Sequence, residues 1–199
     1  KGEKVCFEKL KSIKKEDKVA WFHCASLGEF EQGRPLLEEV KKQYPQYKIL
    51  LSFYSPSGYE VMKNYPLADY IVYLPNDTKR NAKKFVSLVN PDLIFFIKYE
   101  FWYNYISALK GRRLFQVSLI LRESQYFFSW YGKWFRKQLR NFEHFFVQNS
   151  KTADLLNKIG YKNVTISGDT RFDRVMTIAN KAKSFPDIEN FCKGGKKVI

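Results

Sequence analysis

Short apolar segments alternate with segments of helical spacing along most of the chain, and this alternation restricts the possible fold more than any other feature. It predicts an α/β domain with a Rossmann-like, doubly wound, mostly parallel sheet. The apolar runs have the length of strands, and most are bounded by polar or glycine-containing turns. They are Val19–Cys24, Lys48–Tyr54, Tyr70–Leu74, Leu93–Lys98, Leu114–Leu121, Phe145–Gln148 and Val164–Ser167.

Helices are predicted between these runs from their spacing and their capping residues. Thr78 is a candidate cap for a helix that ends near Val89, and Ser150 is a candidate cap for one that ends before Gly160. A basic, aromatic helix is predicted at about Trp130–Asn141.

The turn after the first predicted strand carries a glycine and a carboxylate. The apolar run stops at Ser26-Leu27-Gly28, and a helical pattern starts near Glu29. Gly28 tolerates backbone angles and a close approach that a larger residue would resist, and Glu29 would meet the free N–H groups of the first helical turn. An ionised carboxylate on this rigid turn is a candidate general base. The alternative is that Glu29 only starts the helix, where acidic residues are enriched.

Two further polar turns follow predicted strands, namely Ser55-Pro56-Ser57-Gly58 and Tyr99-Glu100. In open α/β sheets, ligands bind outside the carboxyl ends of the strands. We therefore expect Glu29 and Glu100 to face one cleft, where two like charges would raise the pKa of one carboxyl. The alternative is that these turns are polar only because they are loops.

Several enzyme classes lack support in the sequence. It contains no dinucleotide fingerprint, no P-loop and no Gly-x-Ser-x-Gly turn. The three cysteines show neither metal spacing nor a disulfide framework, which favours a reducing compartment. His23 and His144 lie in or beside apolar strands and are interpreted as structural rather than as metal ligands. No apolar run has the length of a transmembrane helix.

The formal net charge is +15, which favours a polyanionic partner. Aromatic and basic residues are interleaved over Tyr126–Arg140, a mixture that suits an anionic membrane face. The same mixture would suit single-stranded nucleic acid, and an ordinary amphipathic helix with core aromatics is the structural alternative.

The ordered set of short motifs resembles one family, the Kdo transferases of lipopolysaccharide synthesis. These enzymes attach 3-deoxy-D-manno-oct-2-ulosonic acid (Kdo) to the lipid A precursor. The resemblance covers about Val19 to Asp173. The segment Lys98-Tyr99-Glu100-Phe101-Trp102-Tyr103-Asn104 resembles the corresponding motif of a Bacteroides-type branch of the family. The matching motifs are Ala25-Ser26-Leu27-Gly28-Glu29, Ser55-Pro56-Ser57-Gly58, Tyr99 to Asn104, Val147-Gln148-Asn149 and Gly168 to Asp173.

The resemblance implies an inverting GT-B glycosyltransferase without a catalytic metal or other cofactor. Its N-terminal half binds the acceptor, and its C-terminal half binds the donor, CMP-Kdo. The family's catalytic base falls on Glu29 and its second essential glutamate on Glu100. Candidate acceptor-binding residues are Ser26, Gly28, Ser55, Ser57, Gly58, Arg122 and Arg171.

The sequence departs from the family's pattern at several of these places. Lys98 stands where the family often has a glutamate, and Tyr103 stands where it has a proline. A family arginine falls on Ile120, with Arg122 nearby, and Arg171 replaces a usual lysine, which keeps the charge but changes the geometry.

The resemblance also implies a domain plan. Residues 1–18 would be a lead-in helix after a membrane anchor, residues 19–193 the acceptor-binding domain, and residues 194–199 the linker into a donor-binding domain. The expected partners are the lipid A precursor, CMP-Kdo through the second domain, and the cytoplasmic face of the bacterial inner membrane, with no nucleic acid. This piece alone is predicted to be inactive.

Two other functions remain open from the sequence. A nucleotide-sugar epimerase would also use two Rossmann-like halves, without the membrane-facing helix. A basic nucleic-acid-binding α/β module would explain the charge, but not the two glutamates at one edge of the sheet.

Overall fold

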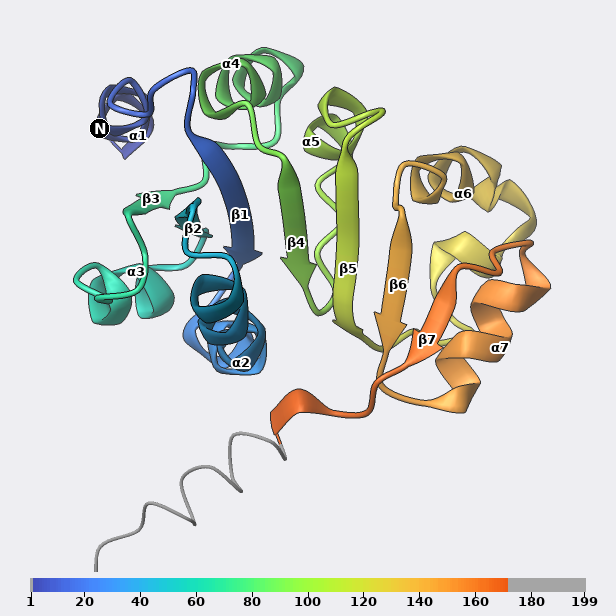
Figure 1. The fold of residues 1–199 in the computed structure, drawn as a ribbon. Coiled ribbons are helices and arrows are strands. Elements are labelled where there is room, and N and C mark those ends of the chain that lie inside the picture. The colour runs from blue at the N-terminus through green and yellow to red at the C-terminus, as the bar shows by residue number, and fades with distance from the viewer. Residues whose placement is uncertain (1, 172–199) are drawn as a thin grey trace, which may run out of the picture.

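The computed structural model describes residues 2–171, which form a seven-stranded parallel sheet between two layers of helices (Figure 1). The strand order is β3-β2-β1-β4-β5-β6-β7, so the predicted doubly wound α/β class is confirmed. The predicted linker at 194–199 lies outside the described residues. The strands are β1 (Lys18–Cys24), β2 (Tyr47–Phe53), β3 (Tyr70–Tyr73), β4 (Leu93–Ile97), β5 (Arg113–Leu119), β6 (His144–Val147) and β7 (Val164–Ile166).

The helices divide between the two faces of the sheet. Apolar side chains of α2 and α3 pack on one face, and those of α1, α4, α5, α6 and α7 pack on the other. None of the helices within residues 2–171 combines the length and the apolar character needed to cross a membrane. The helices are α1 (Gly2–Leu10), α2 (Leu27–Gln43), α3 (Pro56–Met62), α4 (Lys79–Val89), α5 (Tyr103–Ala108), α6 (Lys133–Leu139) and α7 (Ser150–Lys158), with 3-10 turns η1 (Tyr126–Phe128) and η2 (Trp130–Gly132).

Strand β1 is buried on both faces, which is why its sequence is almost uniformly apolar. Trp21 belongs to the core on the side of α4, whereas Phe22 belongs to the core under α2. Phe7 and Leu10 of α1 are buried in the same core as Trp21. Helix α1 is therefore an integral part of this domain.

Two local predictions need correction. The predicted helix at Trp130–Asn141 is a 3-10 turn followed by the short helix α6. The break falls at Gly132, where a β-carbon would lie 2.0 Å from the carbonyl oxygen of Tyr126. The cap of α7 is Asn149, whose side chain accepts a hydrogen bond from the Thr152 N–H, and not Ser150. The predicted cap Thr78 of α4 is confirmed.

The order of the strands creates a switch point beside β1. Strands β2 and β3 lie on one side of β1, and the chain then returns to place β4 on its other side. Helix α2 lies tightly over this junction, since a β-carbon on Gly33 would be 2.8 Å from Cγ1 of Ile97 at the end of β4. In doubly wound sheets, ligands bind at such a switch point, outside the carboxyl ends of the strands.

Candidate functional site

Glu29 lies in the first turn of α2, directly after β1. Its Oε2 accepts a hydrogen bond of 3.0 Å from the backbone N–H of Ser26, which is one half of a capping box. Burial raises the pKa of the Glu29 carboxyl, and the negative charge of Glu100 raises it further. Glu29 therefore does start its helix, and it also has the raised pKa that suits a general base.

Glu100 follows β4, the strand that pairs with β1. Only 8% of its surface is exposed. Its Oε2 accepts a hydrogen bond from Nε1 of Trp102, and Nε2 of His23 lies 3.4 Å from the same oxygen. Trp102 thus holds one oxygen of this carboxylate, and a ring nitrogen of His23 lies near the same oxygen.

The structure brings the two glutamates to the same edge of the sheet. The charge of Glu100 raises the pKa of Glu29. The pKa of the Cys24 thiol, at the end of β1, is raised mainly by burial and then by the charges of Glu29 and Glu100. The three groups therefore share one electrostatic environment.

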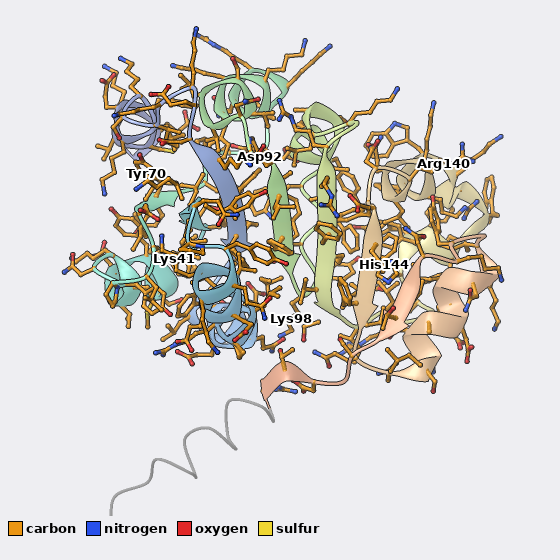
Figure 2. All side chains as sticks on the ribbon, in the orientation of Figure 1. Lys41, Tyr70, Asp92, Lys98, Arg140 and His144 are labelled. Atoms are coloured by element: carbon orange, nitrogen blue, oxygen red, sulfur yellow. The ribbon has the colours of Figure 1, made fainter. Side chains whose placement is uncertain are left out.

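Lys98 adds a positive charge to this edge, at the end of β4 (Figure 2). Its charge lowers the pKa of Glu29 and that of Asp169, so it lies close to both carboxylates. Lys98 adopts a left-handed backbone conformation with φ of 69°, which is uncommon for a residue other than glycine. Its N–H donates to the carbonyl of Val117 at 2.7 Å.

Asp77 explains why the segment around Glu100 keeps its shape. Its Oδ1 accepts hydrogen bonds from the backbone N–H groups of Asn104 (3.1 Å) and Tyr105 (3.2 Å), and Nδ2 of Asn104 donates to the Asp77 carbonyl at 2.8 Å. These contacts join the turn after β3 to the first turn of α5. No sequence motif singled out Asp77, so its anchoring role was not predicted.

The turn after β2 owes its residue types largely to local structure. Oγ of Ser55 caps α3 by accepting from the N–H of Ser57 at 3.3 Å. A β-carbon on Gly58 would lie 2.3 Å from the ring of Phe53. The acceptor-binding roles of Ser55, Ser57 and Gly58 remain predictions.

Gly28 does not need the unusual backbone angles that we expected for it. It lies within α2, it is not among the residues with positive φ, and a β-carbon there would meet no atom of the described residues within 4 Å. The space beside Gly28 is therefore open, which is compatible with the close approach of a ligand.

The two candidate arginines differ in their availability. Arg122 follows β5, its backbone N–H donates to Gln125, and its guanidinium makes no hydrogen bond or ion pair within the described residues. The Arg171 Nε lies 3.0 Å and 2.8 Å from the two oxygens of Asp169, so its guanidinium is already paired.

A buried polar network near the end of β5 was not predicted. Oγ of Ser118 donates to Gln32 Oε1 at 3.2 Å, and Nε2 of Gln148 donates to Oγ of Ser118 at 3.0 Å. Ser118 has a φ of 57°. The available signal was the presence of polar residues inside otherwise apolar runs at strand ends.

These elements fall within a match to a known protein family. The model of the family described as 3-deoxy-D-manno-octulosonic-acid transferase (kdotransferase) matches residues 3–174. The match includes both glutamates and every candidate acceptor-binding residue.

Curated relatives carry the name 3-deoxy-D-manno-octulosonic acid transferase. The relative from Rickettsia bellii is 28% identical over 158 residues, which are 77% of this chain and 38% of the relative. The relative from Aquifex aeolicus is 33% identical over 100 residues, which are 50% of this chain and 28% of the relative. The matched part of the chain thus spans well under half the length of either relative.

Solved structures support the fold. A crystal structure of UDP-N-acetylglucosamine 2-epimerase aligns with a TM-score of 0.63 at 15% identity, over 87% of this chain and 54% of that one. The UDP-GlcNAc 2-epimerase from Neisseria meningitidis aligns with a TM-score of 0.62 at 15% identity, over 88% and 52%. The fold is Rossmann-like, of the kind found in GT-B proteins. With the family model matched over residues 3–174, the chain belongs to the Kdo transferases, a family of glycosyltransferases.

Proposed function

We propose that this chain is the acceptor-binding half of an inverting glycosyltransferase that moves Kdo from CMP-Kdo to a lipid A precursor. One observation carries the proposal, namely the position of Glu29 beside Glu100 at the switch point of the sheet in a chain of this family. A partly buried carboxylate with a raised pKa, held on a rigid helix start, is suited to remove a proton from an attacking hydroxyl group.

The proposed reaction uses one carboxylate as its base. The hydroxyl oxygen of the acceptor bonds to the anomeric carbon of Kdo while the bond from that carbon to the CMP phosphate oxygen breaks. The bonding electrons leave with CMP, and the hydroxyl proton passes to Glu29. By analogy with glycoside hydrolysis, the transition state resembles an oxocarbenium ion. Because this step needs only a positioned base, we propose that it proceeds without a metal cofactor.

The acceptor's phosphates are proposed to meet the positive groups of this edge. The guanidinium of Arg122, which has no partner among residues 2–171, is the best candidate, since arginine binds phosphate through parallel hydrogen bonds. Arg171 would have to exchange its contact with Asp169 for the ligand. The open space beside Gly28 admits a ligand close to the backbone, and Ser26 and the Ser55–Gly58 turn would complete the acceptor site.

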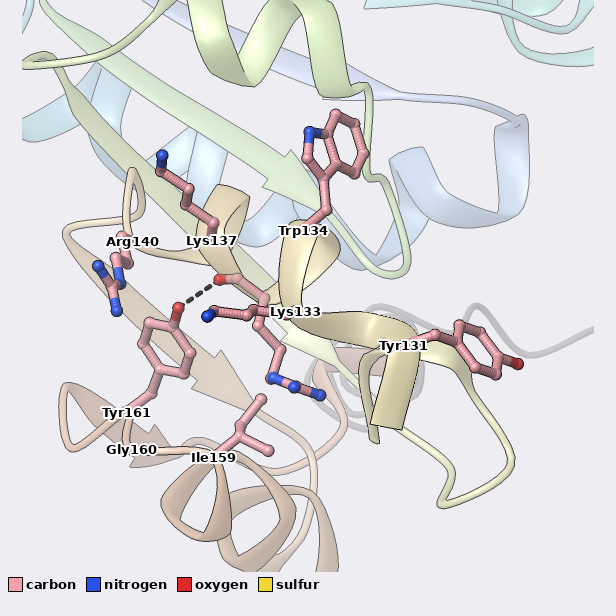
Figure 3. Close-up of a pocket in the computed structure, with 9 residues that line it drawn as sticks. Tyr131, Lys133, Trp134, Lys137, Arg140, Ile159, Gly160 and Tyr161 are labelled. Atoms are coloured by element: carbon pink, nitrogen blue, oxygen red, sulfur yellow. Dashed lines mark hydrogen bonds between the residues drawn. The ribbon is translucent and has the colours of Figure 1, made fainter. Parts of the chain in front are cut away.

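A second surface is proposed to contact the anionic membrane that holds the acceptor. Trp130, Tyr131 and Trp134 expose 91%, 58% and 54% of their surface, which is typical of amphipathic rings at a membrane interface. A hollow of about 860 Å³ lies between α6 and the α7–β7 turn, and its lining includes Lys133, Lys137, Arg140 and Tyr161 (Figure 3). This mixture of rings and cations suits the cytoplasmic face of the inner membrane.

Arg136 is an exception within this surface. Its Nη1 donates to the carbonyls of Phe127 (2.6 Å) and Ser129 (2.9 Å), so it holds the preceding loop in place. We assign Arg136 to the fold rather than to the membrane contact.

The proposed function is tested with the protein of full length, CMP-Kdo and a tetraacylated lipid A precursor. The expected result is a Kdo-bearing lipid and an equal amount of CMP, with the same rate in the presence of a metal chelator. Release of CMP without a glycosylated lipid, or epimerisation of a nucleotide sugar, would contradict the proposal. This chain alone is expected to bind the precursor weakly and to form no product, because the donor would be neither concentrated nor aligned.

A further inference from the structure

His23 is a fully buried histidine whose ring lies near polar groups as well as aromatic rings. It lies on β1 between Trp21 and the strand end. Its ring contacts those of Phe96 and Trp102 edge-on, with centroids 5.5 Å and 5.4 Å away. An apolar residue of similar size would fill this space without leaving two nitrogen atoms to be satisfied.

A short chain of hydrogen bonds holds the Nδ1 side of the His23 ring. Nε1 of Trp21 donates to Oγ of Ser52 at 2.7 Å, and the same Oγ lies 2.9 Å from Nδ1 of His23. An indole nitrogen can only donate, so Ser52 accepts there and has one hydroxyl proton left to give. Nδ1 of His23 is a nearer acceptor for that proton than the carbonyl of Phe22 at 3.5 Å.

This assignment places the ring proton of a neutral His23 on Nε2. Nε2 is buried and has no hydrogen-bond partner of standard geometry among residues 2–171, yet it lies 3.4 Å from Oε2 of Glu100. The other donor to that oxygen is Nε1 of Trp102. The second carboxylate oxygen, Oε1, makes no hydrogen bond within residues 2–171, so it is free for the site.

Resting on the proposed function, we propose that His23 is a positioning residue that holds Glu100 beside Glu29 through the chain Trp21–Ser52–His23. Nε2–H of His23 and Nε1–H of Trp102 secure one oxygen of Glu100 and direct the other toward the site. The position of Glu100 matters because its charge acts on Glu29. A shift of about 1 Å in a catalytic constellation can cost about 100-fold in rate.

Two variants of similar shape test the roles of Nε2 and Nδ1 of His23 separately. The side-chain nitrogen of His23→Gln reaches the place of Nε2 and can donate to Glu100, whereas that of His23→Asn reaches only toward Ser52. In the full-length protein, His23→Asn is expected to lower kcat by about 10- to 100-fold with KM for the precursor within about twofold. His23→Gln is expected to keep kcat within about fivefold of the unsubstituted protein.

His144→Gln is the matched control, since its ring nitrogen bonds Thr165 at 2.9 Å on another part of the sheet. Its kcat should be unchanged. Equal losses in His23→Gln and His23→Asn, tracking equal losses of thermal stability, would overturn the inference and leave His23 a core residue. Unchanged turnover in His23→Asn would do the same.

A measurement without substitution covers the case in which a variant does not fold. Nitrogen-15 shifts of selectively labelled histidine identify which ring nitrogen carries the proton. We expect His23 to show a protonated Nε2 and an unprotonated Nδ1, and the opposite tautomer would contradict the inference.

Glu29→Gln, measured in the same turnover assay as the His23 variants, distinguishes a failure of this inference from a failure of the proposed function. If it stays active, the proposed function fails. If it is inactive while His23→Asn is fully active, only the inference fails.

Discussion

Glu100 lies close enough to Glu29 for its negative charge to raise the pKa of the Glu29 carboxyl, although the two residues follow different strands. Their proximity arises because β1 and β4 are neighbours in the sheet, so the ends of both strands reach the same edge. A base whose pKa is raised is better matched to proton transfer near neutral pH than an ordinary glutamate.

Replacing Lys98 should alter the pH dependence of the reaction. Lys98 lowers the pKa of Glu29, so Lys98→Gln should raise that pKa. Glu29 acts as a base only when ionised, and the rate therefore increases as pH rises through its pKa. The acid limb of the kcat/KM profile should move to higher pH in Lys98→Gln and stay in place in Lys98→Arg. A shift toward lower pH in Lys98→Gln would contradict this electrostatic picture.

Two glycines of α2 should respond in opposite ways to alanine. Gly33→Ala would place a β-carbon 2.8 Å from the buried Ile97 side chain and should cost ~1–3 kcal/mol in the free energy of unfolding. The β-carbon of Gly28→Ala would meet no atom within 4 Å in the described part of the chain, so this variant should be neutral or stabilising by up to ~1 kcal/mol. Urea unfolding measures both changes.

Gly28→Ala also tests the acceptor site, because it separates ligand contact from stability. If a ligand approaches the backbone at Gly28, the variant should raise KM for the precursor several-fold while its stability is kept. An unchanged KM would remove Gly28 from the acceptor site.

Three cations of α6 and its C-terminal turn should contribute to membrane binding. Joint replacement of Lys133, Lys137 and Arg140 by Gln should weaken binding to vesicles that contain anionic lipids, by ~1 kcal/mol for each charge. The matched control replaces Lys14, Lys15 and Lys18, which removes the same charge from exposed positions in the turn before β1 and at its first residue. Equal losses in both triple variants would indicate net charge alone, and no loss at low salt would refute the assigned surface.

Asp69 should stabilise the fold above the acid range. Burial alone would raise its pKa, but hydrogen bonds from the Ile49 N–H (2.9 Å) and from Lys41 and Lys48 lower it overall. Because the folded pKa lies below the unfolded value, this contribution is present above about pH 4 and is lost as pH falls through the folded pKa.

Asp69→Asn should accordingly cost ~1–3 kcal/mol at pH 7 and progressively less in acid. Asp154→Asn, at an exposed position of α7, is the control and should change stability by less than ~0.5 kcal/mol. A cost for Asp69→Asn that stayed constant down to pH 2 would contradict the linkage.

The fold class was predictable because the predicted strands are continuously apolar, and because the apolar residues between them have the spacing of helices. The order of the strands was not, since it depends on which distant segments pair. Local signals were sometimes sufficient, as at Thr78, and sometimes ambiguous, as at Asn149 and Ser150, where either side chain was chemically able to cap α7.

The common edge of Glu29 and Glu100 was predictable from the strand ends, but the contacts of Glu100 were not. Nothing in the sequence near Glu100 shows that His23 and Trp102 meet the same carboxylate oxygen. The break at Gly132 was equally hidden, because it results from the close approach of the Tyr126 carbonyl. The assignment to a Bacteroides-type branch stays a prediction.

The central claim is that Glu29 is the base of a Kdo transfer, and one paired measurement tests it most directly. Glu29→Gln and the control Glu39→Gln, about 15 Å further along the same helix, are compared in the full-length protein for transfer from CMP-Kdo to the precursor and for CMP-Kdo binding by calorimetry. The account predicts that Glu29→Gln lowers kcat by about 100-fold or more with donor binding intact, while Glu39→Gln behaves as the unsubstituted protein. Near-normal turnover in Glu29→Gln would contradict it.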